Sequence, residues 1–268
     1  PSDIARTANP RLSAREIDGP GDDRAGWLCL RNPRLVLRAR TPGDVVAVLA
    51  EAEFQVHAGR VAVCFLAYDA APAFDPAFRV RRPGGSGDLL AWIGVYEHAW
   101  AVDRLPGVAV SPFRRRRWRA SVSASEHARQ VDRARAWIAA GDVYQINLTQ
   151  RLRTRCAGDP WALFQRLAAA QPSAHAAFLN AGERILCSAS PELLFRLDGE
   201  EIVTRPMKGT RPRGRWSEED AQIAASLAAS EKDRAENIMI VDLLRNDMGK
   251  ISKPGSVRVR DLYAVEQY

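Results

Sequence analysis

The sequence predicts an α+β fold in which layered β-sheets are flanked by helices. Helical patterns alternate with paired hairpin strands rather than with single parallel strands. An Asp198-Gly199 pair between two apolar runs also marks a tight hairpin. With 268 residues, 46% of them hydrophobic, the chain can bury a large core and fits one large domain or two modest ones. We expect an α/β region over residues 1–115 and a second region over residues 116–268.

The first region contains one clear helix signal. Thr41-Pro42-Gly43-Asp44 is typical of a helix start, so a helix is expected over Val45–His57, and Gly59 should end it. The secondary structure of the remaining segments is predicted from their apolar runs and turn residues. These are a buried strand at Val61–Tyr68, a flexible loop at Pro83–Gly87 and a strand at Leu89–Tyr96.

The second region opens with a capping box. Ser123-x-x-Glu126 predicts a helix start, and Gly141 should end that helix. A further helix should begin at Asp159-Pro160 and run to about Gln171. The apolar segments between helices are predicted as strands, at Val143–Leu152, Ala176–Leu179, Ile185–Ser188, Leu193–Leu197 and Glu201–Thr204.

Two helices are expected near the end of the chain. Ser217 and Ser230 each precede an acidic residue by three positions, which favours a helix start at both serines. The second helix should run to about Met248 and stop at Gly249.

Charge and cysteine spacing exclude several classes of function. The net charge is +7, and the run Arg114–Arg119 contains five arginines and one tryptophan. This run fits a nucleic-acid patch, but we favour a solvated linker or edge strand because no second basic-aromatic cluster accompanies it. The four cysteines and four histidines lack metal-site spacing, which fits a reducing cytoplasm. No apolar run is long enough for a membrane span.

Lys208 is the most informative single residue. The chain has 39 cationic residues, of which only four are lysines, so arginine supplies most of its positive charge. Arginine stays protonated, whereas a partly desolvated lysine can act as an amine nucleophile. Arg205, Arg211 and Arg213 lie within five positions, and their positive field should favour the neutral amine and attract an anionic substrate.

Two carboxylates are expected near this lysine. Glu192 begins one strand of the predicted hairpin and Lys208 follows the other, so both should lie at the same end of the sheet. Glu236 shares a helix face with Asp233 and Ile240. An acid, an amine and a carboxylate able to hold a hard cation suit an elimination–addition reaction. From spacing alone, Glu192 could equally be a satisfied strand-edge acid and Glu236 a surface ion-pair partner.

Several longer segments carry a resemblance to a known family. They occur in a characteristic order, at Asp142–Arg151, Ser188–Phe195, Arg205–Arg213, Glu231–Asp247, Gly255–Val259 and Val265–Tyr268. In these segments the chain resembles the chorismate-utilising enzymes, strongly from about residue 120 onward and only loosely before residue 115. The resemblance implies an anthranilate synthase component I-like fold. It makes residues 116–268 the N-terminal half of a chorismate-binding catalytic domain.

The resemblance also implies site residues. It assigns the nucleophile to Lys208, the general acid to Glu192, substrate contacts to Gly209 and Thr210, and one ligand of a Mg²⁺ cofactor to Glu236. Related isochorismate synthases use a lysine base where this chain has Gln145, which argues against that activity.

Lysine at position 208 makes the chain similar to component I of the aminodeoxychorismate synthases, since anthranilate synthases usually have alanine there. This implies chorismate and ammonia as substrates, a role in 4-aminobenzoate and folate synthesis, and a separate glutamine amidotransferase subunit. Anthranilate synthase component I and a non-catalytic chorismate-binding fragment are the alternatives. The family continues well past Tyr268, so we expect that the chain ends within its catalytic domain and is inactive alone.

Overall fold

The computed structural model describes residues 6–7, 26–80, 88–105, 107, 112–171 and 175–267. The described residues form two compact units. One combines the chain up to residue 105 with residues from Phe164 onward, and the other spans Gly107 to Leu163. The expected boundary at residue 115 therefore does not coincide with the division into compact units, and it stays a prediction about the family's parts. The predicted loop at Pro83–Gly87 lies outside the described residues.

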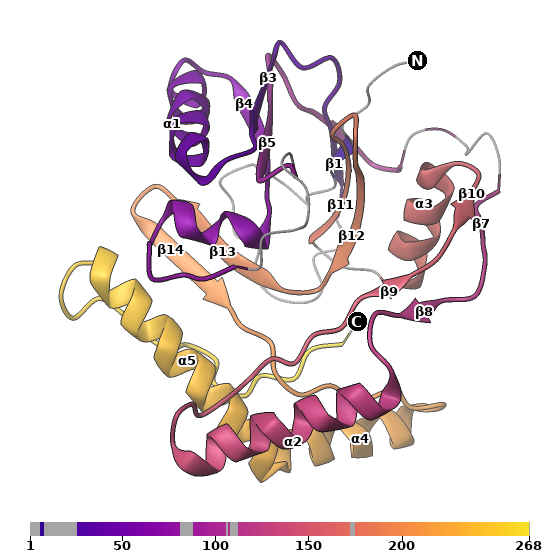
Figure 1. Ribbon diagram of the computed structural model, residues 1–268, viewed down its shortest axis with the longest axis vertical. Coiled ribbons are helices and arrows are strands. Elements are labelled where there is room, and N and C mark those ends of the chain that lie inside the picture. The colour runs from indigo at the N-terminus through magenta and orange to yellow at the C-terminus, as the bar shows by residue number, and fades with distance from the viewer. Residues whose placement is uncertain are drawn as a thin grey trace. The chain divides into compact units, whose positions relative to one another are not determined.

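A five-stranded antiparallel sheet combines strands from both chain segments of the first unit. Its strands β1, β11 and β12 are labelled in Figure 1. Its order is β12-β11-β1-β2-β6. The bounds are β1 Arg6–Thr7, β2 Trp27–Cys29, β6 Trp100–Val102, β11 His175–Asn180 and β12 Ile185–Ser190. β11 and β12 confirm two of the predicted strands and pair along their whole length, from His175 opposite Ser190 to Asn180 opposite Ile185.

A second, three-stranded sheet has the order β3-β5-β4. Its strands are β3 Leu35–Ala39, β4 Val61–Leu66 and β5 Ala91–Tyr96, and a 3₁₀ helix, η1, follows at Tyr68–Ala73. All six residues of β5 are buried. The prediction of a buried strand at Val61–Tyr68 was wrong in two respects. β4 ends at Leu66, and it is an edge strand with exposed Cys64 and Leu66, because β5 takes the central position.

Helix α1, Pro42–His57, confirms the predicted helix start and covers one face of this sheet. Its Val45 and Ala52 pack with alternate β5 residues, including Ile93 and Val95. The side chains on the other face of β5 are Trp92 and Tyr96, which cluster with Leu30, Leu89, Leu179 and Ala181. β5 is therefore enclosed between α1 and side chains from the five-stranded sheet region, which explains its complete burial.

In the second unit, two short ladders form one ribbon. β7, Arg114–Arg115, pairs with β10, Cys156–Ala157, and β8, Arg119–Ala120, pairs with β9, Leu152–Arg153. The Arg116 N–H also donates to the Arg155 carbonyl, so the pairing continues between the ladders. The register then shifts by one residue, as in a β-bulge. The predicted strand at Val143–Leu152 was wrong: within it only β9, which begins at Leu152, is a strand, although the Arg151 carbonyl beside it accepts from the Ser121 N–H.

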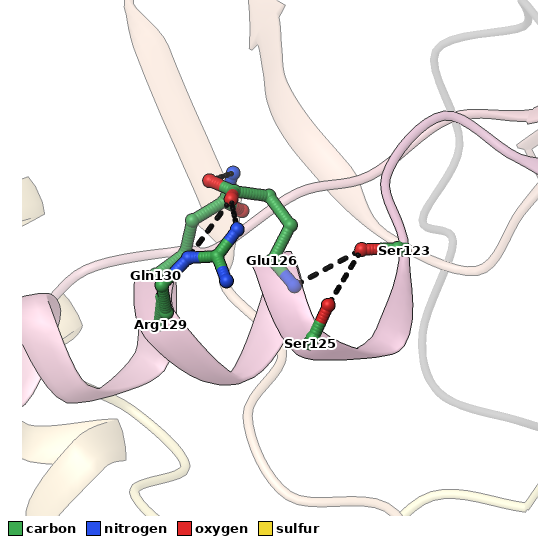
Figure 2. A network of polar contacts seen from close by, with 5 residues as sticks. All are labelled: Ser123, Ser125, Glu126, Arg129 and Gln130. Atoms are coloured by element: carbon green, nitrogen blue, oxygen red, sulfur yellow. Dashed lines mark hydrogen bonds and ion pairs between the residues drawn. The ribbon is translucent and has the colours of Figure 1, made fainter.

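Helix α2, Ala124–Ala140, confirms the predicted cap. The Ser123 hydroxyl accepts from the Glu126 backbone N–H at 3.1 Å, and the Glu126 carboxylate accepts from the side chains of Arg129 and Gln130 (Figure 2). Gly141 ends the helix with a φ of 79°, a left-handed conformation that suits glycine. Helix α3, Pro160–Ala170, begins as predicted, with the Asp159 carboxylate accepting from the Trp161 N–H.

The last part of the chain forms a hairpin and two helices: β13 Leu193–Asp198, β14 Glu201–Arg205, α4 Ser217–Ala229 and α5 Glu231–Ile251. Asp198 pairs with Glu201, so the turn residues are Gly199 and Glu200, one position later than predicted. This suits the left-handed φ of 57° at Gly199, which glycine adopts without steric cost.

The predicted helix start at Ser217 is confirmed, but the expected serine cap does not form there, and the last helix was predicted to end too early. The N-cap of α4 is Trp216 without a side-chain hydrogen bond, because Glu219 and Asp220 accept from the preceding loop instead. α5 begins at a true Ser230 cap, but it continues past Gly249 to Ile251. Gly249 is not among the glycines with positive φ, and an Asp247–Lys250 ion pair spans this turn. Among the described residues, no helix has both the length and the apolar character needed to cross a membrane.

Candidate functional site

The hairpin brings Glu192 to the chain segment that contains Lys208. Leu193 pairs with Arg205 at the open end of the hairpin, so Glu192 and Pro206 follow outward from this pair. The Glu192 carboxylate accepts a hydrogen bond from the Met207 N–H at 3.2 Å. Its own N–H donates to the Ser190 hydroxyl at 3.2 Å, which fixes the turn between β12 and β13. The predicted proximity of this carboxylate and the lysine segment is therefore realised through Met207.

Gly209 brings the same segment onto helix α5. Its φ is 75°, and a Cβ placed on it would lie 3.0 Å from the side chain of Asp233. Arg211 donates to the Asp233 carboxylate at 2.7 Å and to the Thr210 carbonyl at 2.9 Å. A hydrogen bond from Ser230, aided by Arg211 and opposed by burial, holds the pKa of Asp233 below its ordinary value. Residues 209–211 are thus attached to the first turn of α5.

Glu236 lies one helical turn after Asp233 on α5. Its side chain is half-buried, and the ammonium of Lys232 lies 3.8 Å from its carboxylate. An exposed pair of this kind contributes little stability and leaves the carboxylate accessible to a cation. Within the described ranges, no three His, Cys, Asp or Glu side chains converge as a metal site. Mg²⁺ binding through Glu236 therefore stays a prediction.

The three arginines around Lys208 are each paired with a carboxylate. Arg205 pairs with Glu266, Arg211 with Asp233 and Arg213 with Asp220. From the sequence we expected these arginines to add their positive fields at Lys208. The paired carboxylates offset much of that field, so part of the expected effect is cancelled.

His175 is a neighbour of the site that the sequence did not reveal. It stands opposite Ser190 at the end of β12, two residues before Glu192. Its pKa is lowered, first by burial and then by the positive charge of Arg205, while Glu266 opposes the shift. His175 and Glu266 are 91 positions apart, as their numbers show, and neither belongs to a recognisable spacing pattern with the other. The strand register places His175 beside Ser190, and Glu266 approaches through its ion pair with Arg205.

Two other sequence predictions concern the second unit. Gln145 is half-buried on its non-helical segment. The Arg114–Arg119 run is exposed and forms strands, as the edge-strand interpretation predicts. However, the ribbon pairs it with a second basic segment, in which Arg119 stands opposite Arg153. This second segment is basic but contains no aromatic residue, so it is not a second basic-aromatic cluster.

The profile of the chorismate binding enzymes matches residues 96–268, more than half of the chain. The chain belongs to this family. It is 43% identical over 159 residues to aminodeoxychorismate synthase component 1 of Salmonella typhimurium, covering 59% of this chain and 35% of that protein. It is 42% identical over 174 residues to anthranilate synthase component 1 of Thermus thermophilus, covering 63% of this chain and 38% of that protein. The chain thus spans little more than a third of these chorismate-binding relatives.

The fold is also that of this family. The crystal structure of anthranilate synthase component I from Streptococcus pneumoniae superposes with a TM-score of 0.65 at 19% identity. The superposition covers 90% of this chain and 65% of the other. This confirms the expected α+β, anthranilate synthase component I-like fold. Identity this low supports the architecture alone, and it does not distinguish the reactions of the family members.

Proposed function

We propose that the whole protein converts chorismate and ammonia to 4-amino-4-deoxychorismate through a covalent adduct on Lys208. The observation that supports this most is the contact between the Glu192 carboxylate and the Met207 N–H at 3.2 Å. It joins the carboxylate to the residue next to Lys208, so that an acid and an amine lie at one end of a hairpin. An acid and a nucleophile so arranged suit the exchange of a hydroxyl for an amine.

The reaction would have two displacement steps. In the first, the Lys208 amine forms a bond to ring carbon 2 of chorismate, both ring double bonds shift, and the bond from carbon 4 to its hydroxyl breaks. Glu192 gives a proton to that hydroxyl, which leaves as water. In the second, ammonia bonds to carbon 4 and gives a proton back to Glu192, both double bonds shift back, and the lysine nitrogen leaves carbon 2. The net change replaces one hydroxyl by one amine and releases water.

The second candidate is anthranilate synthase, in which ammonia adds at carbon 2 and pyruvate is eliminated. Overall identity does not separate the two, since the values are 43% and 42%. The amine at position 208 favours the first candidate, because arginine is the default cation of this chain and only four lysines occur. A lysine retained here fits a need for a deprotonatable amine.

The partner and cofactor are parts of the same proposal. A separate glutamine amidotransferase subunit would supply the ammonia, and none of the four cysteines in residues 1–268 lies in a Gly-x-Cys-x-Gly segment of the kind used to hydrolyse glutamine. Mg²⁺ would be held by Glu236 together with groups beyond those described here. When bound it would neutralise a substrate carboxylate. The four free thiols fit a cytoplasmic location. The exposed arginine ribbon has no role in this proposal, which assigns neither a nucleic acid nor a membrane as partner.

The test uses the full-length protein with chorismate and an ammonium salt. We expect 4-amino-4-deoxychorismate in the wild type, identified by liquid chromatography and mass spectrometry, and its loss in Lys208→Arg and Lys208→Ala. Lys250→Arg is the matched control, because Lys250 is an exposed lysine in a surface pair with Asp247. In the absence of ammonia, the peptide with Lys208 should carry a chorismate-derived adduct. Anthranilate as the main product would refute the proposal, and so would full activity of Lys208→Arg.

A further inference from the structure

Arg211 makes two contacts that no other described residue near Lys208 combines. One guanidinium nitrogen donates to the Thr210 carbonyl at 2.9 Å, and another donates to the Asp233 carboxylate on α5 at 2.7 Å. The Asp233 side chain is only 12% exposed, whereas that of Arg211 is 39% exposed. A guanidinium can hold two acceptors at once in a fixed planar geometry, which an ammonium cannot do.

Gly209 lies against the same carboxylate. A Cβ at this position would come within 3.0 Å of the Cβ, Cγ and Oδ1 atoms of Asp233. Contacts this short leave no room for a side chain between the backbone of residue 209 and the helix. The Asp233 side chain therefore packs against the backbone of Gly209, and its carboxylate accepts a hydrogen bond from Arg211. Thr210 lies between these two contacts in the sequence.

We infer that Arg211 and Asp233 form a positioning clamp that fixes residues 208–210 against helix α5. Neither residue is assigned to the chemistry. The clamp links the segment with the nucleophile to the helix that carries Glu236, three positions after Asp233. Its catalytic consequence rests on the proposed function, whereas its effect on the position of Lys208 can be measured without turnover.

The first test measures activity in the full-length protein. Asp233→Asn removes the charge with little change in shape, and Arg211→Met removes both donors. We expect kcat/KM for chorismate to fall by roughly tenfold to a hundredfold, since a displacement of about 1 Å at a reacting group can cost that much. Glu201→Gln and Arg260→Met are matched controls, because they break an arginine–carboxylate pair of 2.6 Å at the far end of β14. Both should stay close to the unsubstituted protein.

The second test reads the position of Lys208 directly. The chain has four lysines, so limited labelling with an amine-reactive reagent and peptide mass spectrometry can resolve each one. We expect labelling of Lys208 relative to Lys250 to rise several-fold in Asp233→Asn and Arg211→Met. Arg211→Lys should give an intermediate rise, because one ammonium keeps the charge but does not span both acceptors. The two controls should leave the ratio unchanged.

The outcomes separate the two proposals. An unchanged Lys208 labelling ratio in Asp233→Asn and in Arg211→Met would overturn the clamp, whichever product the enzyme makes. A raised ratio in a protein that makes anthranilate would support the clamp and refute the proposed function. If circular dichroism shows that Asp233→Asn has lost helix content, the labelling ratio of Arg211→Lys decides instead, because that substitution leaves the sequence of α5 unchanged.

Discussion

In β5 all six residues are buried, whereas none of the residues from 182 to 267 is. The part of the molecule around β5 is held by packing, since α1 and three hydrophobic clusters enclose this central strand. The part from residue 182 to 267 carries Glu192, Lys208 and Glu236, and its segments are joined by hydrogen bonds and ion pairs. Examples are Met207 with Glu192 and Arg211 with Asp233.

This difference indicates which perturbations each region should resist. A close-packed core responds to changes of volume, because a cavity loses contacts that nothing replaces. A region held by polar contacts responds to changes of charge, pH and backbone geometry, and it opens at lower free energy. Within residues 1–268, the candidate site therefore lies in the part that is held mainly by polar contacts.

The largest effect is expected from a cavity in the first region. Ile93→Ala should lower the free energy of unfolding by about 2–5 kcal/mol, because Ile93 is fully buried in the cluster under α1. Leu197→Ala on β13 should change it by less than about 0.5 kcal/mol, because that side chain is 63% exposed. Urea denaturation followed by circular dichroism measures both. Equal losses would contradict the distinction between the two regions.

A glycine pair gives the next largest effect. Gly209 and Gly199 both have left-handed φ, 75° and 57°, so alanine at either costs roughly 1–2 kcal/mol of strain. At Gly209 the new Cβ would also collide with Asp233, whereas at Gly199 nothing lies within 4 Å. Gly209→Ala should therefore reduce chorismate binding, measured by calorimetry, while Gly199→Ala should affect stability alone. Normal binding by Gly209→Ala would show that the contact with α5 can relax without consequence.

A smaller effect concerns acid pH. The Arg213 hydrogen bond, with the Gly214 N–H, lowers the pKa of Asp220 from 3.8 to about 2. Because this pKa is depressed in the folded protein, the stabilisation is complete above pH 3.8 and is lost as the pH falls towards 2. Hydrogen exchange should show the loop at 213–215 opening before β5 on acidification. In Arg213→Met the Asp220 carboxyl, followed by carbon-13 NMR, should titrate closer to its ordinary value.

The smallest effect is expected at a polar atom inside the core. The Tyr96 hydroxyl is buried without a hydrogen-bond partner among the described residues, and burial raises its pKa. Tyr96→Phe removes an unsatisfied group and keeps the ring, so stability should be unchanged or should rise by up to about 1 kcal/mol. A loss of stability in thermal unfolding would reveal a partner for this hydroxyl.

Local signals in the sequence predicted most elements correctly. The Ser123 and Ser230 caps and the left-handed Gly141 depend on contacts within a few residues, so the local sequence is enough to predict them. The turn at Gly199 was misplaced by one residue because Asp198-Gly199 and Gly199-Glu200 are both reasonable turn pairs. Only the register of the strands decides between them.

What the sequence could not predict depends on partners far away along the chain. A strand was expected at Val143–Leu152 from its composition, but most of this segment is not a strand. Strand formation also requires a neighbouring strand whose backbone groups can pair with it, and composition does not reveal that neighbour. For the site, the proximity of Glu192 to the lysine segment could be predicted from the hairpin. The approach of Gly209 to Asp233 could not, because it depends on how α5 packs against an irregular segment.

The strand β1 has a consequence for how the protein folds during synthesis. It lies between β2 and β11, and its partner positions in β11, Ala177 and Phe178, follow about 170 residues later. At typical elongation rates the ribosome needs roughly ten to thirty seconds to make that stretch. Until then β1 has a neighbour on one side only, and the other edge offers unpaired hydrogen-bonding groups. The nascent chain should therefore depend on protection from aggregation until β11 emerges and closes the sheet.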